Sequence, residues 1–224
     1  MKKIKVTVAG KEHLGYVPEI EKAILFASKI KGTGLAKRSG KYIKEKILEG
    51  KAIIAIFDKK KFAGFCYIES WGHKRFVANS GLIVPEEFRG MGLAFNIKRK
   101  AFNLSRILFP TAKLFGLTTS LAVMKLNSAL GYKPVTFSEL TDDDEFWKGC
   151  QTCAYYDILF RTNRTHCLCT AMLCDNKKAR RNGKKIHKIK GQLIGRFVKE
   201  SLGKGKRQKA EGKREEVEEV KMRK

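Results

Sequence analysis

Residues 77–103 combine residue types that are suited to binding a phosphorylated ligand. An apolar run at 77–84 predicts a strand, and Arg89, Gly90 and Gly92 follow it just before a segment with helical periodicity. The first backbone N–H groups of a helix have no partner within the helix, and the helix dipole favours negative charge at that end. Glycine lets the chain approach a phosphate closely, and arginine adds a permanent positive charge. The order of strand, glycine turn and helix therefore predicts a site for a phosphate or diphosphate.

Two other phosphate-binding patterns are excluded by the spacing. The dinucleotide pattern needs three glycines and an acidic residue about 20 positions further on, whereas residues 89–94 supply only Gly90 and Gly92. A P-loop needs Gly-Lys followed by Ser or Thr, and no such sequence follows here. The pair of glycines also fits a tight strand-to-helix connection that binds nothing. Whether this segment binds a phosphate or only connects a strand to a helix therefore has to be judged from the neighbouring segments.

The glycine segment resembles the acetyl-CoA-binding signature of the GNAT superfamily of N-acyltransferases. That signature is written R/Q-x-x-G-x-G/A, and it is matched by Arg89, Gly92 and Ala94. In the family it follows a strand that ends in an apolar-x-Val segment, which residues 82–84 match. The resemblance covers residues 4–160 and implies acetyl-CoA as co-substrate. It assigns the cofactor contacts to Leu82, Ile83, Val84, Arg89, Gly90, Met91, Gly92, Leu93 and Ala94.

A second match is the helix predicted at 121–130, which is followed by Gly131 and Tyr132. In GNAT proteins such a helix lies along the pantetheine arm and ends in glycine followed by an aromatic residue. Many members carry a tyrosine four residues before that glycine as general acid for the departing thiolate, and here this position holds Asn127. An amide donates hydrogen bonds but does not release a proton at a useful pKa. The general acid is therefore unassigned, with Tyr132 or water as the alternatives.

An N-acyl transfer needs a neutral amine and a polarised thioester carbonyl. The resemblance implies that backbone donors of residues 82–84 polarise the carbonyl. As general base we expect Glu69 at the end of the third predicted strand, with Asn79, Ser80 or a water chain as substitutes; a solvated strand-end carboxylate is the alternative for Glu69. Cys66 would suit a covalent acyl-enzyme, but a cysteine in an apolar strand is usually a small buried hydrophobe, so we expect direct transfer in a ternary complex. The catalytic candidates are Glu69, Ser80, Asn127 and Tyr132.

The acceptor is predicted from short segments and from charge. The segments KGTGLAKR, ANSGLIV, LGYKPVTFSELTDDDEFWKGCQTC and CLCTAML together resemble an acetyltransferase family found among bacterial amino-acid genes, of the N-acetylglutamate-synthase type. This implies an amino acid such as glutamate as acceptor, and its carboxylates need cations, which Lys37 and Arg38 offer. Two surface charges in a basic protein are the alternative. We expect Asn79 and Thr118 to lie beside Lys37 and Arg38 in the substrate-binding site. A small-molecule amine, a protein lysine or a protein N-terminus remains an alternative acceptor.

Four of the six cysteines stand in two close pairs, Cys150 with Cys153 and Cys167 with Cys169. Two such pairs separated by a short span are typical of a tetrahedral zinc site. The second pair has one intervening residue instead of the usual two to four, and a strand is predicted between the pairs at 154–160. Zinc is therefore the alternative, and reduced thiols that pack near the start of the C-terminal segment are the expectation.

The hydrophobic periodicity predicts an α/β (α+β) fold with a mixed, mostly antiparallel central sheet and flanking helices, which is also how GNAT chains are built. We expect a GNAT domain at 1–160, a cysteine-containing extension at 161–176, and a basic, largely disordered tail at 177–224. The expected strands are 4–8, 52–57, 62–70, 77–84, 113–118, 134–137 and 154–160, and the expected helices are 12–30, 41–48, 92–108, 121–130 and a short one capped within 141–145.

The composition fits a globular enzyme with a basic extension. The chain has 224 residues, 43% of them hydrophobic, and a formal net charge of +26, half of which lies in residues 177–224. This excess suits nucleic acid, an anionic membrane face or the phosphates of CoA, and also a solvated basic surface. The chain has no run of 18 apolar residues and no recognisable signal peptide, which predicts a cytoplasmic protein without a membrane partner.

Two functions from other classes compete with acetyl transfer. A non-catalytic acyl-CoA sensor would use the same pocket, and the replacement of the usual tyrosine by Asn127 makes it a real alternative. A nucleic-acid-binding or ribosome-associated protein would act through the basic residues 177–224. The sequence is compatible with a homodimer.

Overall fold

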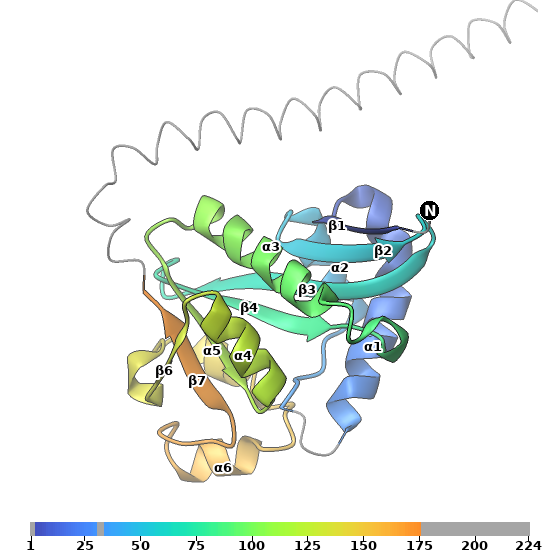
Figure 1. The fold of residues 1–224 in the computed structure, drawn as a ribbon. Coiled ribbons are helices and arrows are strands. Elements are labelled where there is room, and N and C mark those ends of the chain that lie inside the picture. Colours follow the sequence, from blue (N-terminus) through green and yellow to red (C-terminus); the bar gives the residue numbers. More distant parts are fainter. Residues whose placement is uncertain (1–2, 31–33, 176–224) are drawn as a thin grey trace, which may run out of the picture. The chain divides into compact units, whose positions relative to one another are not determined.

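The sheet at the centre of the molecule is mixed, as the sequence predicts. The computed structural model describes residues 3–30 and 34–175, and within these residues seven strands form one sheet in the order β1-β2-β3-β4-β5-β7-β6 (Figure 1). All neighbouring strands in it are antiparallel except β4 and β5. The strands are β1 (Ile4–Val8), β2 (Ala52–Phe57), β3 (Lys61–Trp71), β4 (Phe76–Ile83), β5 (Lys113–Thr118), β6 (Lys133–Val135) and β7 (Thr170–Cys174).

Helices cover both faces of the sheet. The helix α3 crosses one face, and α1 and α2 pack against the other (Figure 1). Among the described residues, no helix is both long and apolar enough to cross a membrane. The helices are α1 (Val17–Lys29), α2 (Gly40–Leu48), α3 (Leu93–Leu108), α4 (Leu121–Ala129), α5 (Asp144–Lys148) and α6 (Tyr156–Arg161), and short 3-10 helices lie at Lys11–Tyr16, Glu86–Phe88 and Phe137–Glu139.

Polar caps determine where several helices begin. The side chains of Ser39, Ser120 and Asp143 accept hydrogen bonds from backbone N–H groups in the first turns of α2, α4 and α5. The short helix expected after Thr141 and through Trp147 is therefore present as α5, but its N-cap residue is Asp143 and not Thr141. The first helix starts later than predicted, because residues 11–16 form a 3-10 helix and Pro18 favours the first turn of α1.

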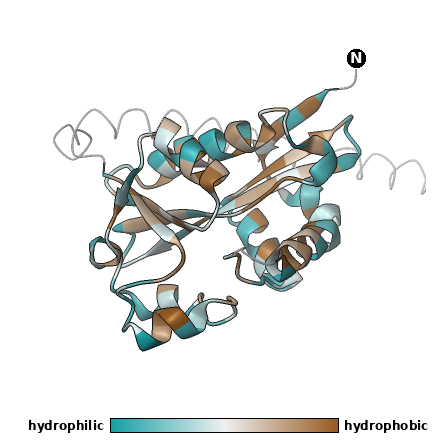
Figure 2. Cartoon of the chain, turned by 60° about the horizontal axis from the view of Figure 1, so that its bottom comes forward, coloured by the Kyte–Doolittle hydropathy of each residue, from teal (hydrophilic) through white to brown (hydrophobic). Residues whose placement is uncertain are grey.

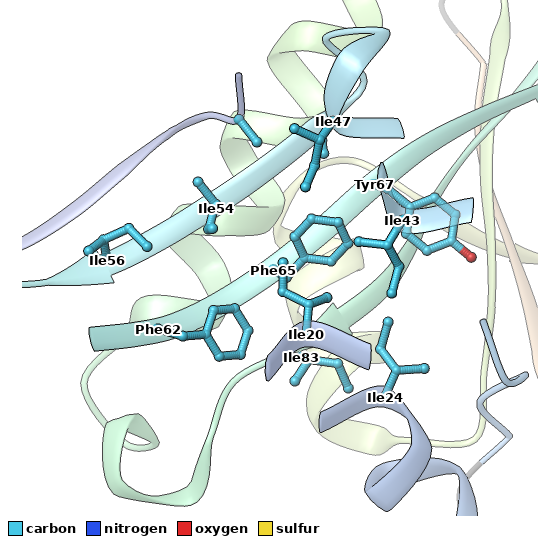
Figure 3. Close-up of a cluster of buried hydrophobic side chains, with 12 residues drawn as sticks. Ile20, Ile24, Ile43, Ile47, Ile54, Ile56, Phe62, Phe65, Tyr67 and Ile83 are labelled. Atoms are coloured by element: carbon cyan, nitrogen blue, oxygen red, sulfur yellow. The ribbon is translucent and has the colours of Figure 1, made fainter. Parts of the chain in front are cut away.

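Alternating side chains of β2 and β3 build two cores, one on each face of the sheet. Ile54 and Phe65 point toward α1 and α2, where Ile20 and Ile43 cover them (Figure 3). Ile53, next in sequence to Ile54, packs on the opposite face in the cluster that contains α3. The central strands are therefore largely hydrophobic, whereas the helices alternate between hydrophilic and hydrophobic residues (Figure 2).

The strands β4 and β5 run side by side over a short distance only. Their parallel pairing joins residues 76–78 to residues 113–115, beyond which β4 stays paired with β3 and β5 with β7. The register between β3 and β4 shifts by one residue near Gly81, whose φ is +63°. Such a bulge bends a strand away from its original direction. The two strands consequently separate after residue 78.

One expectation about the C-terminal part is wrong. The apolar run at 154–160 predicts a strand, but it forms α6, and the last strand is β7, which lies between β5 and β6. Only Leu159 of α6 is buried, whereas residues 171–173 are buried on both faces of the sheet. The strand β7 thus lies beyond the boundary expected at residue 160, within the segment expected as a cysteine-containing extension. The tail expected at 177–224 lies outside the described residues.

We predict that Gly81→Ala destabilises the protein by about 2–4 kcal/mol. The substitution strains a backbone with φ of +63° and places Cβ 2.4 Å from Cε1 of Tyr67. Gly15→Ala is the matched control, because a Cβ there meets no atom within 4 Å, and it should change the free energy of unfolding by less than about 1 kcal/mol. Urea denaturation measures both variants. A Gly81→Ala protein as stable as the control would contradict the role given to this bulge.

Candidate functional site

A cleft of about 1630 Å³ opens where β4 and β5 separate. Residues 79–84 form one wall, and residues 116–118 of β5 contribute to the other. The helices α1 and α4 and the segment 34–39 complete the walls. Arg89 and Ala94 of the glycine segment also line this space, so the cleft connects the predicted phosphate site with the end of the paired strands.

The glycine segment leaves the N-terminus of α3 open. Gly92 is the N-cap residue with a φ of +70°, Gly90 has a φ of +76°, and no side chain within residues 3–30 and 34–175 caps the helix. A Cβ at either glycine would meet no atom within 4 Å, so glycine is required here for its backbone conformation and not for packing. Arg89 folds back and donates a hydrogen bond from Nε to the carbonyl of Val84 at 3.2 Å. The segment thus combines open helix N–H groups with a nearby cation, as anion binding requires.

The other residues that were predicted to contact a cofactor fall into two groups. Leu82, Ile83, Val84 and Ala94 line the cleft. Leu93 is instead buried in the core beneath α3, and the side chain of Met91 is 63% exposed. Neither Leu93 nor Met91 is part of the cleft lining.

Asn127 presents an unpartnered acceptor in the cleft wall. The residue is 1% exposed, and its Nδ2 lies 3.6 Å from Sδ of Met172. Its Oδ1 is buried and has no hydrogen-bond partner among the residues that the structure describes. A buried acceptor without a partner costs about 1–3 kcal/mol. The position is therefore suited to a ligand that brings an N–H group.

Tyr132 and the side chain of Asn79 lie on the α3 side of the sheet. Tyr132 is 2% exposed, is not part of the cleft lining, and donates a hydrogen bond to Oδ1 of Asn79 at 3.2 Å. The Nδ2 of Asn79 donates to Ser105, and Lys98 Nζ donates to the Asn79 carbonyl at 2.8 Å. Burial raises the pKa of Tyr132 and lowers that of Lys98. This placement gives Tyr132 no access to a group that reacts in the cleft, and it commits the Asn79 amide to the interior.

Glu69 lies beside the point where the two strands separate. It is opposite Ala78 in the sheet register, and Ala78 is the last residue of β4 that pairs with β5. Its carboxylate accepts hydrogen bonds from Lys46 Nζ, at 2.8 Å, and from the Tyr42 hydroxyl. Burial raises the pKa of Glu69 to about 7, although the nearby Arg38 guanidinium acts to lower it. A carboxylate that lines a cleft and titrates near neutrality is a candidate proton acceptor.

Arg38 is held in the cleft by two hydrogen bonds. Its Nε donates to the hydroxyl of Tyr67 and its Nη1 to the carbonyl of Lys37, both at 2.8 Å. Burial raises the pKa of Tyr67, against the effects of Arg38 and of a hydrogen bond with Ser80. Lys37, Ser80 and Thr118 also line the cleft. The hydroxyl of Thr118 accepts a backbone N–H from two residues further along the chain, at 3.0 Å.

Three residues of this region are missed by sequence reasoning. Tyr42, Lys46 and Tyr67 surround Glu69 and Arg38, yet none belongs to the glycine motif or to the second match at 121–132. The spacing of Tyr42 and Lys46 does place them on one helix face. The proximity of this helix face to Glu69 can be recognised only when the structure shows that α2 packs against β3.

Four cysteines line another part of the cleft. Cys150, Cys153, Cys167 and Cys169 are free thiols, close enough to influence one another, and burial raises the pKa of Cys150 to about 11 and also that of Cys169. Within the described ranges, no three His, Cys, Asp or Glu side chains form a group that could hold a metal ion, so zinc is not supported. Cys66 is buried in β3, where burial raises its pKa to about 11, which fits a packed thiol.

The fold agrees with those of solved acetyltransferase structures. N-acetylglutamate synthase from Neisseria gonorrhoeae, complexed with coenzyme A and N-acetyl-glutamate, aligns with a TM-score of 0.57 and 16% identity over 77% of this chain and 35% of that chain. Rv2747 from Mycobacterium tuberculosis, in complex with CoA, aligns with a TM-score of 0.56 and 14% identity, over 76% of this chain and 98% of that chain. An acetyltransferase of the GNAT family from Staphylococcus aureus Mu50 aligns with a TM-score of 0.52 and 13% identity, over 63% of this chain and 90% of that chain.

These similarities establish the fold and confirm the architecture predicted from the sequence. No protein-family model and no curated sequence matches the chain. The chain spans about a third of the length of the Neisseria enzyme. The described residues therefore have the GNAT fold, and the chemistry of the cleft has to be inferred from its own side chains.

Proposed function

We propose that the protein transfers an acetyl group from acetyl-CoA to the primary amine of an amino acid, directly and within a ternary complex. The observation that carries this proposal is the cleft along the separated strands β4 and β5, which connects the glycine segment before α3 with the Glu69 carboxylate. The fold adds support, because the aligned Neisseria and Mycobacterium structures contain CoA.

Two features of the chain fit the CoA group. The glycine segment offers Arg89 and the uncapped first turn of α3 to a diphosphate. The unpartnered Oδ1 of Asn127 suits an amide N–H of the pantetheine arm. We assign the polarisation of the thioester carbonyl to backbone donors of residues 82–84. When bound, acetyl-CoA supplies a thioester whose acyl carbon is attacked by the amine.

Glu69 is the candidate general base. With a pKa of about 7 it is largely ionised above neutrality and can take a proton from the ammonium form of the acceptor. Below pH 7 the carboxyl becomes protonated and loses this capacity, so the rate should fall as the pH decreases through 7. Ser80 lies in the same wall, but a serine hydroxyl does not titrate in this range.

Arg38 is the candidate partner of the acceptor carboxylate. The hydrogen bonds to Tyr67 and to the Lys37 carbonyl fix its guanidinium, and its Nη2 lies toward Gly149 in the cleft wall. A fixed guanidinium suits a carboxylate better than a mobile ammonium. Glutamate is the first acceptor to test, because N-acetyl-glutamate is bound in the Neisseria structure. Other amino acids, small amines, protein lysines and protein N-termini are the alternative acceptors.

A non-catalytic acyl-CoA sensor is the second candidate. It is favoured by one observation, namely that neither Asn127 nor the buried Tyr132 can protonate a departing thiolate in the cleft. A nucleic-acid-binding or ribosome-associated function would depend on residues 177–224, which lie outside the described residues.

Release of free thiol from acetyl-CoA across a panel of amino acids, polyamines and peptides tests the proposal. We expect turnover with at least one amino acid, with kcat/KM rising through pH 7, and Glu69→Gln should lower kcat/KM by about 10²–10⁴-fold. Glu139→Gln, at an exposed residue outside the cleft, is the control. CoA binding without thiol release against the whole panel would favour the sensor. Full activity in Glu69→Gln would show that Glu69 is not the base.

We also predict that Gly92→Val weakens CoA binding by about tenfold or more, since strain of about 1–2 kcal/mol displaces the chain from the left-handed conformation. Gly50→Val is the matched control: its φ is +66°, close to the +70° of Gly92, and a Cβ meets no atom within 4 Å at either position. Isothermal titration calorimetry with CoA compares the two. Equal affinities would mean that the diphosphate lies elsewhere.

A further inference from the structure

Two side chains of α2 hold the Glu69 carboxylate. Lys46 Nζ donates to Oε1 at 2.8 Å, and the Tyr42 hydroxyl donates to Oε2. Tyr42 and Lys46 are four positions apart, a spacing that places both on one face of the helix. One helix face, outside every motif recognised in the sequence, therefore supplies a partner to each oxygen of this carboxylate.

Lys46 approaches Glu69 from the protein interior. Its side chain is 9% exposed, and it is not part of the cleft lining, whereas Tyr42 and Glu69 both are. Burial of an ammonium group is unfavourable unless partners compensate for the lost water. Besides Glu69, the Tyr42 ring centroid lies 5.0 Å from Nζ, and Glu49 forms a second ion pair at 3.5 Å. These three neighbours fix the ammonium behind the carboxylate.

A contribution to fold stability does not by itself explain why Lys46 and Glu69 form an ion pair at this position. Apolar residues of similar volume replace buried ion pairs at little or no cost in many proteins. Two other residues of the same helix, Ile43 and Ile47, are fully buried and apolar, whereas the neighbours of Lys46 Nζ are two carboxylates and an aromatic ring. The charge at this position therefore points to a role in the electrostatics of Glu69.

We propose that Lys46 and Tyr42 are positioning residues that keep the Glu69 carboxylate ionised and aimed into the cleft. The inference rests on the proposed function above, in which Glu69 accepts the proton of the acceptor ammonium. Burial favours the neutral carboxylic acid, and the ammonium and the hydroxyl oppose this by stabilising the anion. Neither residue touches the substrate in this role.

The carboxylate retains the capacity to act as a base while it is held. Each carboxylate oxygen has two lone-pair sites, of which Lys46 and Tyr42 use one apiece. A free site can take the proton from the acceptor –NH₃⁺, which leaves –NH₂ and a neutral Glu69. The amine then would form the new C–N bond as the C–S bond breaks, after which the nitrogen loses a second proton to solvent. CoA would leave as the thiolate and take a proton from solvent, and the proton on Glu69 would also return to solvent.

Other charged or titratable groups near Glu69 have to be considered in any test. Arg38, from the segment before α2, lowers the pKa of Glu69, and its guanidinium lies 5.4 Å from the Tyr42 ring centroid. Glu49 competes for the Lys46 ammonium, and Lys51 binds Glu49 at 2.9 Å. Tyr67 lies on the strand of Glu69 and is bonded to Arg38. All of these remain in place when Lys46 alone is changed.

The test compares Lys46→Met, Lys46→Arg and Tyr42→Phe with the wild-type protein. Carbon-13 NMR of labelled glutamate side chains, assigned with Glu69→Gln, gives the pKa of Glu69, and thiol release gives the pH profile of kcat/KM. We expect Lys46→Met to raise both the pKa of Glu69 and the acidic limb of the pH profile by about one to two pH units, since the anion loses a charged hydrogen-bond donor while burial still favours the neutral acid. Tyr42→Phe should shift both in the same direction by less, and Lys46→Arg should restore the wild-type profile.

Lys44→Met is the matched control, because Lys44 lies on the same helix, is exposed to solvent and does not line the cleft. It should leave the Glu69 pKa unchanged. A Glu69 pKa that stays at the wild-type value in folded Lys46→Met protein overturns the inference. Because NMR titration needs no turnover, it decides the inference even if the wild-type protein releases no thiol, a result that would count against the proposed function alone.

Discussion

The strands β4 and β5 share hydrogen bonds only between residues 76–78 and 113–115, and the rest of the site depends on this short pairing. Backbone groups of a strand that leaves its neighbour must find other partners, because buried N–H and C=O groups without partners are unfavourable. Here the bulge at Gly81 turns β4 away, and residues 79–84 form a wall of the cleft instead of a continued ladder. An extended ligand with its own amide groups is the natural partner of such a wall.

Burial controls the electrostatics of the residues around this separation. Glu69 lies where the core formed with α1 and α2 meets the cleft, so its carboxyl is desolvated on one side and open to a ligand on the other. Lys46 and Arg38 provide positive charge from the interior and from the cleft, respectively. Lys98 is buried near the opposite face of β4 and donates to the Asn79 carbonyl. Each of these four charged side chains thus has a hydrogen-bond partner that compensates for the loss of water.

The parts of the site that were predictable are those encoded locally. The run from 77 to 94 specifies strand, turn and helix through neighbouring residues, and Glu69 and Arg38 could be proposed from the charge types that the reaction needs. Lys46 and Tyr42 could not, because their role depends on the packing of α2 against a strand more than 20 residues away in sequence. The same limit explains the error at 154–160, since a short apolar run fits a helix as well as a strand until its tertiary neighbours are known. The cysteine spacing is likewise compatible with a metal site, which was the alternative to packed thiols, but no three His, Cys, Asp or Glu side chains of the described residues form a group that could hold a metal ion.

The central claim is that the separation of β4 from β5 receives the arm of acyl-CoA. Amide hydrogen exchange, measured on the full chain with and without CoA, tests it most directly. The account predicts slower exchange with CoA at residues 79–84 and in the first turn of α3, and unchanged exchange in β1 at the far edge of the sheet. This claim would be contradicted if saturating CoA left the exchange of residues 79–84 unchanged. Protection from exchange concentrated in α6 would also contradict it.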